Sequence, residues 1–501
     1  MSRQDQIIDE RKRKLAGLRK LINPYPHKFE VKNYSDEIKD KYKKLKNDEK
    51  IKNKVDVAGR IMTMRDLGKL IFATIQDGKG RLQLILQKKV TNEKDFELFK
   101  KYVDVGDFIG ANGMIMKTKT GEISVLVRDL KILSKSLLPL PEKWHGLKDE
   151  EERYRKRYLD LIMNPEVKDV FNKRTEILNV IRELMMKKNI AEVETPYMQT
   201  IYGGANAKPF KTHLNALDID LFLAISPELY LKRLIVGGYD KVYTISRNFR
   251  NEGIDRWHNP EFTMMEIYCS YKDYNDMMDL FEEIYEYTAK KVNGNTKIKF
   301  RDKIIDFKRP WKRMTMAACI KKYAGIDINK MSDKEISNFV KKNKIESKED
   351  VWGWNVQAIF EHFCQEKIEQ PTFILDHPLE TTPLCKIHRN DKLCRIIERF
   401  EPFCMGIELG NAYSELNDPE LQRELLEKQQ KMLKKGDELA NPIDEDFINA
   451  VEIGMPPAGG LGLGIDRMVM LLTGQDSIKD VILFPFMKPL NENNDKNEEK
   501  I

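Results

Sequence analysis

The stretch FRNEGIDRWHNPEFTMMEIY, residues 249–268, constrains the fold more than any other part of this sequence. Two runs of strand-forming residues flank a glycine-bearing centre near residues 253–257, which predicts a β-hairpin with its tip there. Side chains alternate between the two faces of a strand. One face of the outgoing strand should therefore carry Phe262, Met264, Glu266 and Tyr268. The incoming strand is expected to line up Asn248, Arg250 and Glu252. Carboxylates and a cation on such faces indicate a ligand site rather than a core.

The chain is long enough for two or more domains, and its composition is that of a folded protein with a charged surface. It has 501 residues, of which 41% are hydrophobic and 33% are charged. It contains no apolar run of about 18 residues, so no membrane span is expected. The first residues lack the apolar core of a secretory signal. The cysteines show no metal-ligand spacing, so we expect reduced thiols in a cytoplasmic protein.

The positive charge is concentrated near the N-terminus. The net charge is +7, and residues 1–50 hold 15 Lys and Arg against 9 Asp and Glu. A basic arm is typical of proteins with a polyanionic partner, but a solvated charged helix would have the same composition. Charge alone does not decide between these interpretations.

Changes of pattern along the chain predict its domain organisation. The predicted segments are a basic helical N-terminal extension (1–50), a small β-barrel (51–137), a linker (138–160), a larger α/β unit (161–490) with a helical insertion (292–370), and a disordered polar tail (491–501). The OB-fold is one candidate for the barrel.

Two positions on the predicted barrel strands, one aromatic and one polar, are candidate ligand contacts. Ile71, Ala73 and Ile75 alternate with Phe72 and its neighbours, so Phe72 should face away from the aliphatic interior. Gln83 has the same orientation on the next strand. An outward phenylalanine can stack on an unpaired base, although a ring packed under a loop would show the same pattern.

The common nucleotide-binding signatures are missing. The sequence has neither a G-x-x-x-x-G-K-[ST] loop nor a G-x-G-x-x-G turn between a strand and a helix. The glycine-rich run GLGLGIDR instead ends in Arg467. Together with Arg250 it offers two cations for phosphate oxygens, and Phe262 offers a flat face for a purine.

The chain resembles the class II aminoacyl-tRNA synthetases, and within subclass IIb the lysyl-tRNA synthetases. Three motifs carry the resemblance: the segment EVETP ending at Pro196, the 249–268 hairpin, and GLGLGIDR. The blocks YGGANAKPF, ISPELYLKRL and MGIELGNAYSELND also match, with Ile407 where arginine is usual. The resemblance implies an α+β protein: an N-terminal OB-fold β-barrel that reads the anticodon, and a class II antiparallel-sheet catalytic domain with a helical insertion.

The resemblance also assigns roles to residues of the ATP site. Arg250 would contact the α-phosphate and Arg467 the distal phosphates, and both would be catalytic. The remaining ATP-binding residues would be Glu252, His258, Asn259, Phe262, Glu401, Glu408 and Gly464. Glu401 and Glu408 would hold Mg2+, which one or two carboxylates suffice to bind together with phosphates and waters. A turn near residues 404–406 would bring these two glutamates together.

A pocket for a cationic substrate follows from the residues themselves. In N-A-Y-S-E the polar residues alternate with small ones, so one strand face joins Glu266 and Tyr268 in surrounding a pocket with carboxylates and phenols. The resemblance makes it the L-lysine site and implies these contacts: Gly204, Glu228, Glu266, Tyr268, Asn411, Tyr413 and Glu415. It also implies that the anticodon is read by Phe72, Gln83 and Glu122.

The resemblance makes tRNA-Lys, L-lysine and ATP the partners and predicts a homodimer. We expect the dimer interface to include the apolar stripe Ile177, Ile181 and Leu184 and the segment ending at Pro196. Two alternatives remain at this stage. One is a relative that attaches lysine to a protein, and such relatives usually lack the barrel domain. The other is an RNA-binding paralogue without catalysis, which loss of Arg250, Arg467 or the glutamate pair would have favoured.

Overall fold

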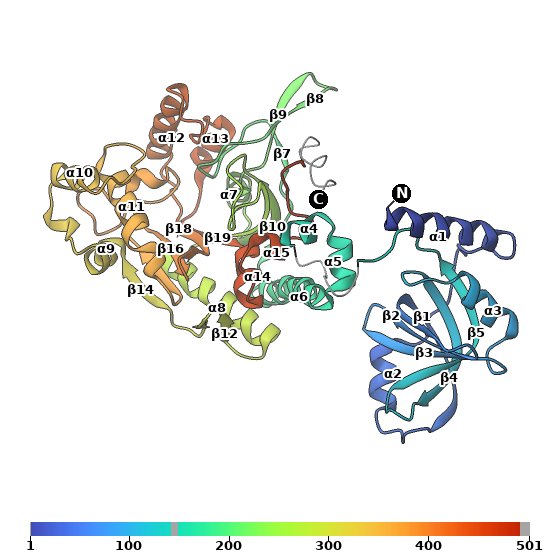
Figure 1. Cartoon of the computed structure of the whole chain (residues 1–501). Coiled ribbons are helices and arrows are strands. Elements are labelled where there is room, and N and C mark those ends of the chain that lie inside the picture. Colours follow the sequence, from blue (N-terminus) through green and yellow to red (C-terminus); the bar gives the residue numbers. More distant parts are fainter. Residues whose placement is uncertain (1, 142–148, 491–501) are drawn as a thin grey trace. The chain divides into compact units, whose positions relative to one another are not determined.

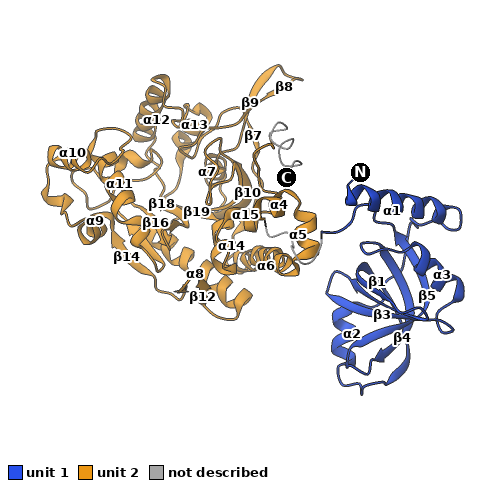
Figure 2. Cartoon of the chain, in the orientation of Figure 1, with its two compact units in different colours: residues 1–148 blue, residues 149–501 orange. Residues whose placement is uncertain are grey.

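The computed structural model describes residues 2–141 and 149–490. The chain separates into two compact units, residues 1–148 and residues 149–501 (Figures 1 and 2). Among the described residues, no helix combines the length and apolar character that a membrane crossing requires. The tail predicted for residues 491–501 lies outside the described residues.

The first unit is a closed five-stranded barrel in the order β1-β2-β3-β5-β4, and β4 pairs back with β1. Its elements are α1 (Arg3–Arg19), α2 (Ser35–Tyr42), β1 (Lys50–Asp66), β2 (Leu70–Gln76), β3 (Arg81–Gln87), α3 (Glu93–Tyr102), β4 (Phe108–Lys117) and β5 (Ile123–Ser134). The barrel interior holds the alternating aliphatic residues, including Ile71, Ala73 and Ile75, as the sequence predicts. Closure leaves this sheet without exposed edges.

The helices before the barrel are part of the barrel unit rather than a separate extension. Leu18 of α1, together with Ile38 and Tyr42 of α2, packs into the same core as the strands. The prediction of helix within residues 1–50 is therefore matched by α1 and α2, but the segment does not extend away from the barrel. Leu18, Ile38 and Tyr42 are buried because they face the barrel.

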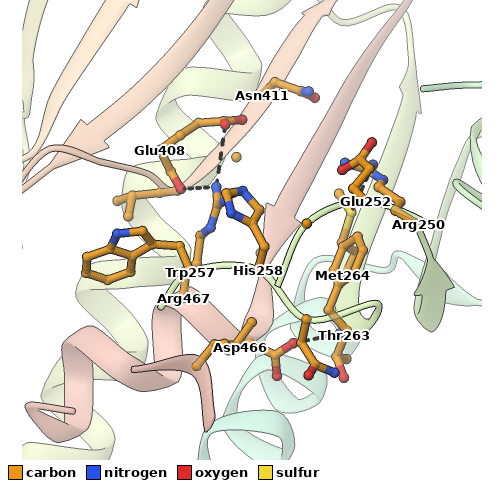
Figure 3. Close-up of a pocket in the computed structure, with 17 residues that line it drawn as sticks. Arg250, Glu252, Trp257, His258, Thr263, Met264, Glu408, Asn411, Asp466 and Arg467 are labelled. Atoms are coloured by element: carbon orange, nitrogen blue, oxygen red, sulfur yellow. Dashed lines mark hydrogen bonds and ion pairs between the residues drawn. The ribbon is translucent and has the colours of Figure 1, made fainter. Parts of the chain in front are cut away.

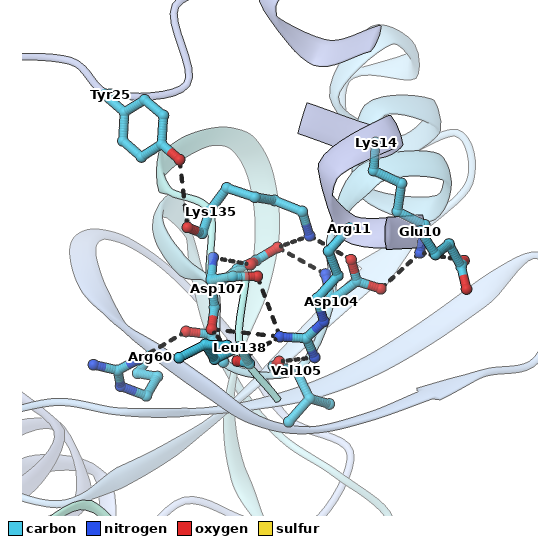
Figure 4. A network of polar contacts seen from close by, with 12 residues as sticks. Glu10, Arg11, Lys14, Tyr25, Arg60, Asp104, Val105, Asp107, Lys135 and Leu138 are labelled. Atoms are coloured by element: carbon cyan, nitrogen blue, oxygen red, sulfur yellow. Dashed lines mark hydrogen bonds and ion pairs between the residues drawn. The ribbon is translucent and has the colours of Figure 1, made fainter. Parts of the chain in front are cut away.

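A network of buried charges fastens α1 to the barrel (Figure 4). The Arg11 guanidinium donates hydrogen bonds to the carbonyls of Val105 at 2.9 Å and Leu138 at 2.9 Å. The fully buried ammonium of Lys135 donates to Asp104 and, at 2.8 Å, to Asp107. Buried charges are tolerated when each has a partner, and this network supplies one for each of these groups.

The second unit is built on a nine-stranded sheet whose main path runs β14-β15-β16-β18-β19-β11-β10-β6, with β17 paired to β16. Its strands are β6 (Ala191–Glu192), β10 (Lys241–Phe249), β11 (Glu261–Ser270), β14 (Lys312–Thr315), β15 (Thr372–Leu375), β16 (Arg399–Cys404), β17 (Ile407–Glu408), β18 (Gly410–Ser414) and β19 (Ala458–Gly464). The central pairs are antiparallel, and the pairs β14–β15 and β6–β10 at the two edges are parallel. Two smaller sheets contain β7 (Met198–Gln199), β8 (Lys211–Leu214) and β9 (Ile219–Leu223), and β12 (Lys297–Phe300) and β13 (Lys303–Asp306).

Helices cover one face of this sheet. The helices of the unit are α4 (Glu150–Arg155), α5 (Arg157–Met163), α6 (Pro165–Lys187), α7 (Glu228–Val236), α8 (Tyr274–Asn293), α9 (Met316–Ala324), α10 (Asp333–Lys342), α11 (Trp352–Phe363), α12 (Pro419–Lys434), α13 (Glu445–Gly454), α14 (Ile465–Thr473) and α15 (Ile478–Val481). Residues of α6, α8 and α14 form one core with Met265 and Ile267 of β11 and Leu461 of β19. The other face of these strands carries the site, and α7 packs against that face beside Val242 of β10 and Tyr268 of β11.

Two predicted domain boundaries differ from the structure. Helices α4 and α5 of the second unit span residues 150–163, so they begin within the stretch 138–160 that the sequence predicted as a linker. Arg157 explains this: its buried guanidinium pairs with Asp160 at 2.7 Å and donates to the carbonyls of Lys479 and Leu483. The insertion predicted at 292–370 contains β14, a strand of the main sheet. Helices α9, α10 and α11 share a second core, which also includes Ile374 of β15 and Phe403 of β16.

The apolar stripe of α6 is not available to a partner chain. Ile177 and Ile181 are fully buried and Leu184 is 4% exposed, all within the core between α6 and the sheet. The prediction that this stripe forms a dimer interface is therefore wrong. The periodicity was correctly identified as a buried face, but it is covered by this chain's own α8 and β11.

Replacing the buried cation of the barrel network tests how much that network contributes to stability. Lys135→Met should leave Asp107 buried without its ion-pair partner, which destabilises a fold by about 3–5 kcal/mol. Hydrogen exchange of barrel amides, followed by mass spectrometry, should speed up accordingly. Lys43→Met, which removes an exposed ion pair with Asp40, is the matched control. Equal exchange in the two variants would contradict this account.

Candidate active site

The hairpin predicted from residues 249–268 is formed by β10 and β11. The two strands pair from Lys241 with Cys269 to Phe249 with Glu261. The strand ends there, so Arg250 and Glu252 lie in the connecting loop and do not continue a strand face, as the sequence had suggested. The Arg250 N–H still donates across the hairpin to the carbonyl of Pro260 at 2.9 Å, and the Asn251 N–H donates to the carbonyl of Lys208 at 2.8 Å. On β11 the expected alternation holds, because Met265 and Ile267 lie in the core while Met264, Glu266 and Tyr268 line a pocket.

The outer ends of β11 and β19 line a first pocket with the loop of the hairpin (Figure 3). Most of the residues predicted to bind a nucleotide meet there: Arg250, Glu252, His258, Asn259, Phe262, Glu408, Gly464 and Arg467. Trp257 lines the same pocket, and the sequence reasoning did not single it out. Its position directly before His258 in the loop was the available signal.

The cations of this pocket are held in place by neighbouring groups. Arg467 donates to the main-chain oxygen of Glu408 at 2.6 Å and lies 3.4 Å from its carboxylate. Arg250 stacks over the Phe262 ring, 5.1 Å from its centroid. His258 Nδ1 lies 2.8 Å from the carboxylate of Asp255. Figure 3 shows Arg250 and Glu252 on one side of the pocket and Arg467, His258 and Trp257 on the other. Such fixed positive charges suit a polyanion.

Glu401 and Glu408 are brought together by a tight turn, as predicted. Cys404 pairs with Ile407, and the two residues between them, Met405 and Gly406, both have left-handed φ angles of 54° and 74°. Both glutamates line a second pocket next to the first. Burial raises the pKa of each carboxyl, and Glu401 raises that of Glu408 further. This pair therefore attracts cations, of which Arg399 already contacts Glu401 at 2.5 Å.

A metal ion at this pair would need ligands from a substrate. Within residues 2–141 and 149–490, no cluster of three or more His, Cys, Asp or Glu side chains could hold a metal by itself. Two carboxylates fit Mg2+, which keeps several waters and commonly binds phosphates. The donor set is compatible with the predicted role.

The second pocket collects the residues predicted to bind an amino acid. Its lining includes Gly204, Glu228, Glu266, Tyr268, Asn411 and Tyr413. The phenol of Tyr413 donates to Glu228 at 2.6 Å, and the hydroxyls of Ser226 and Tyr268 donate to Glu266 at 2.9 and 3.1 Å. Burial, and then the nearby Glu228 carboxylate, raises the pKa of Glu266 to about 8. The pocket therefore gathers carboxyl groups whose negative charge is costly until a cation binds.

Glu415 lies behind the wall of this pocket rather than on its surface. Its side chain is fully buried, and Oε2 lies 2.5 Å from Nζ of Lys232. A Cβ at Gly460 would come within 1.8 Å of Glu415 Oε1 and 2.6 Å of the Tyr268 ring. Glycine at this position of β19 therefore leaves the space through which the carboxylate faces the pocket.

Sequence reasoning missed Lys232. It lies on α7 one turn after Glu228, with Nζ 2.6 Å from the Glu228 carboxylate. A glutamate and a lysine four residues apart usually indicate an exposed helix pair, so the pattern hid a buried cation. The apolar residues around it on α7 were the available signal.

Comparison with known proteins agrees with this geometry. Residues 149–488 match the model of class II tRNA synthetases for D, K and N, and residues 55–133 match that of the OB-fold nucleic acid binding domain. A lysine–tRNA ligase of Methanoculleus marisnigri is 50% identical, over 97% of this chain and 96% of the relative. One from Thermoanaerobacter pseudethanolicus is 50% identical over 97% of each chain. The chain belongs to the lysine–tRNA ligase family of class II tRNA synthetases.

Family membership confirms the architecture predicted for this ligase. The barrel of β1 to β5 is its OB-fold domain, and the sheet of the second unit is its class II catalytic domain. A lysine–tRNA ligase of Thermosipho africanus, 45% identical over 97% of this chain and 96% of the relative, shows that the likeness persists at lower identity.

Gly460→Ala tests the geometry of the second pocket in this ligase. The added methyl would overlap the Glu415 carboxylate, and overpacking of this kind costs about 1–3 kcal/mol, or roughly a ten- to hundred-fold loss in amino-acid activation. ATP–pyrophosphate exchange measures that loss. Gly237→Ala is the control, because its Cβ would approach no atom closer than 3.4 Å. If the two variants kept equal activity, the second pocket would not be the amino-acid site.

Proposed function

We propose that this ligase activates L-lysine with ATP and transfers it to the 3′-OH of the terminal adenosine of tRNA-Lys. The observation that carries the proposal is the second pocket, where Glu228, Glu266 and Glu415 converge with two phenols. Such a pocket suits a substrate with two ammonium groups and disfavours the acidic or neutral side chains of aspartate and asparagine. The names of the 50% identical relatives support the same substrate.

The two pockets share a boundary where the reaction would take place. Arg250, Met264, Glu408 and Asn411 line both. With adenine against Phe262 and the distal phosphates toward Arg467 and His258, the α-phosphate would lie at this boundary beside Arg250. The carboxylate of lysine, oriented by Asn411, would then attack it in line, and pyrophosphate would leave. Alignment and charge stabilisation account for catalysis here without a general base.

Glu401 and Glu408 are proposed to hold Mg2+ against the phosphates of ATP. When bound, the ion neutralises phosphate charge and orients the leaving pyrophosphate. The residues themselves contribute the ligands, and Arg399 fixes the Glu401 carboxylate. Asn259 lines the first pocket, where its amide donates to the carbonyl of Glu261 at 2.6 Å and accepts from the N–H of Phe486 at 3.2 Å, so it would support the adenine end by holding these segments together.

The roles proposed within the lysine pocket are those that the family resemblance implies. Glu415 and Tyr268, with Glu266 beside them, would receive the ε-ammonium at the closed end. Glu228 and Gly204 would receive the α-ammonium nearer the nucleotide. Gly204 has a left-handed φ of 86°, and a Cβ there would come within 2.9 Å of Ser226 Oγ, so the backbone can approach a ligand closely.

The anticodon is proposed to bind the outer surface of the barrel. Phe72 on β2 and Gln83 on β3 face outward, and Glu122 directly precedes β5, which pairs with β3. Phe72 packs with Ile85 and Met116 outside the main barrel core, so its ring remains partly exposed. An aromatic ring that packs against the protein on one face can stack on a base with its other face.

The remaining proposals concern assembly and location. A homodimer stays a prediction, now without the α6 stripe; exposed apolar residues after β6, including Tyr197 and Met198, offer a surface for it. Five of the six cysteines are buried and none forms a disulfide among the described residues. Reduced thiols support a cytoplasmic enzyme. The barrel argues against a relative that lysylates proteins, and Arg250, Arg467 and the glutamate pair argue against an inactive paralogue.

Glu415→Gln tests the substrate assignment. Losing a charge-assisted contact to the ammonium costs about 1.5–3 kcal/mol, so the KM for lysine should rise roughly ten- to hundred-fold while the KM for ATP is unchanged. Pyrophosphate exchange with lysine, aspartate and asparagine measures both constants and the substrate preference. Glu424→Gln, which removes an exposed pair with Lys428, is the control. Wild-type kinetics for lysine in Glu415→Gln would refute the assignment.

Phe72→Ala should separate the two halves of the reaction. Loss of one stacked base costs about 1–3 kcal/mol, which raises the KM for tRNA roughly five- to hundred-fold. Pyrophosphate exchange should be unaffected, because Phe72 belongs to the barrel unit and the ATP site to the other. Phe108→Ala removes another outward ring of the barrel, which lies under Arg60, and serves as control. An unchanged KM for tRNA in Phe72→Ala would exclude the stacking role.

A further inference from the structure

The buried ammonium of Lys232 has no role in the function proposed above. Its side chain is 1% exposed, and Nζ lies 2.6 Å from Glu228 and 2.5 Å from Glu415. The rings of Tyr413 and Phe447 flank it, with centroids 5.6 and 5.8 Å from Nζ. Lysine is almost never buried unless it is paired. Here it connects two carboxylates from elements far apart in the sequence, α7 and the end of β18.

The carboxyl groups at the amino-acid end of the second pocket outnumber the ammonium groups of the proposed substrate. Glu228, Glu266 and Glu415 supply three carboxyl groups there. Under the function proposed above, the substrate brings two ammonium groups, and its carboxylate is oriented by Asn411 toward the α-phosphate. One carboxylate would remain unmatched in a buried site, which is costly. Lys232 supplies the missing positive charge and does so without entering the lining of the pocket.

We propose that Lys232 is a positioning and specificity-determining residue, whose ammonium bridges the Glu228 and Glu415 carboxylates and fixes the orientation in which both face the ammonium groups of lysine. This inference rests on the proposed function. The Tyr413 phenol, which also donates to Glu228 Oε1, fixes the orientation of the same carboxylate. Glu415 has one oxygen on Lys232 and keeps Oε1 free of hydrogen bonds within the described structure. That oxygen is the one beside Gly460, toward the pocket.

The ionisation of these groups supports the geometry. Burial raises the pKa of Glu415 well above its ordinary range, and the Lys232 ammonium opposes that rise. Burial lowers the pKa of Lys232, but Glu228 and Glu415 more than compensate, so it stands above its ordinary value. The groups facing this pair are Glu266 and Tyr268 from β11, Tyr413 from β18, Cys385 and Arg399. The pKa values of the thiol and both phenols are also raised, so they stay neutral.

Removing the ammonium should therefore change the pH dependence of lysine binding. Without Lys232, Glu415 keeps its proton to higher pH, and a protonated carboxyl cannot pair with the substrate ammonium. The KM for lysine should be high at low pH and should fall as the pH rises through the pKa of Glu415. In the wild-type protein the same fall should occur at lower pH, because the ammonium favours the ionised carboxylate.

The test is Lys232→Met in the full-length protein, assayed by ATP–pyrophosphate exchange across about pH 6–9. We expect the KM for lysine near neutral pH to rise about ten- to hundred-fold, its pH profile to move to higher pH, and the KM for ATP to stay unchanged. Lys272→Met, which removes an exposed pair with Asp276, is the control. A wild-type KM and pH profile for lysine, or equal losses for lysine and ATP, would overturn the proposal.

A double variant covers the case in which Lys232→Met does not fold. Lys232→Met/Glu415→Gln removes one charge of each sign and leaves the buried site balanced. If Lys232 acts through Glu415, the double variant should have nearly the same KM for lysine as Glu415→Gln alone. A further rise of that KM, about ten- to hundred-fold over Glu415→Gln, would overturn the proposal. Failure of the wild-type protein to activate lysine would instead refute the proposed function, so the two failures are distinguishable.

Discussion

Strand β11 contributes side chains both to the core of the catalytic unit and to the two pockets. Met265 and Ile267 point into the core beneath α6, α8 and α14, and the alternate residues Met264 and Glu266 line the pockets. The core therefore fixes the register of the strand, since a shift by one residue would place carboxylates among aliphatic side chains. The position of every ligand group on β11 is set by the packing of its neighbours. The same argument applies to β19, where leucines face the core and glycines face the pocket.

This arrangement places several carboxyl groups in a buried site, where their ionised forms are unfavourable. Glu266, Glu401, Glu408 and Glu415 all have raised pKa values, with burial as the main cause in each case. The protein offsets this strain with hydroxyl donors and with two internal cations, Lys232 and Arg399. The site is thus prepared for positively charged or metal-bound ligands before they arrive. Preparation of this kind makes electrostatic stabilisation effective in an active site.

Local patterns in the sequence predicted much of this site. Alternation along β11 and the glycine-rich run of β19 correctly indicated which side chains share a face, and the family motifs brought distant segments into one hypothesis. Local patterns in the sequence did not show which segments contact one another. The α6 stripe was identified as buried, but periodicity cannot say whether a face meets its own chain or a partner. Lys232 followed the pattern of a surface pair, and only the packing of α7 against β10 and β11 and the contact with Glu415 show that it is internal.

The hydrogen bonds of Arg157 determine when the catalytic unit can finish folding during synthesis. This residue stands near the beginning of the catalytic unit, yet the carbonyls that receive its guanidinium belong to Lys479 and Leu483, more than 300 positions later. A ribosome delivers the chain from its N-terminus, so α5 emerges long before those partners exist. By contrast, Arg11 finds its acceptors at Val105 and Leu138 within the first unit. The barrel unit can thus fold during synthesis. The catalytic unit can form the hydrogen bonds of Arg157 only when translation is nearly complete.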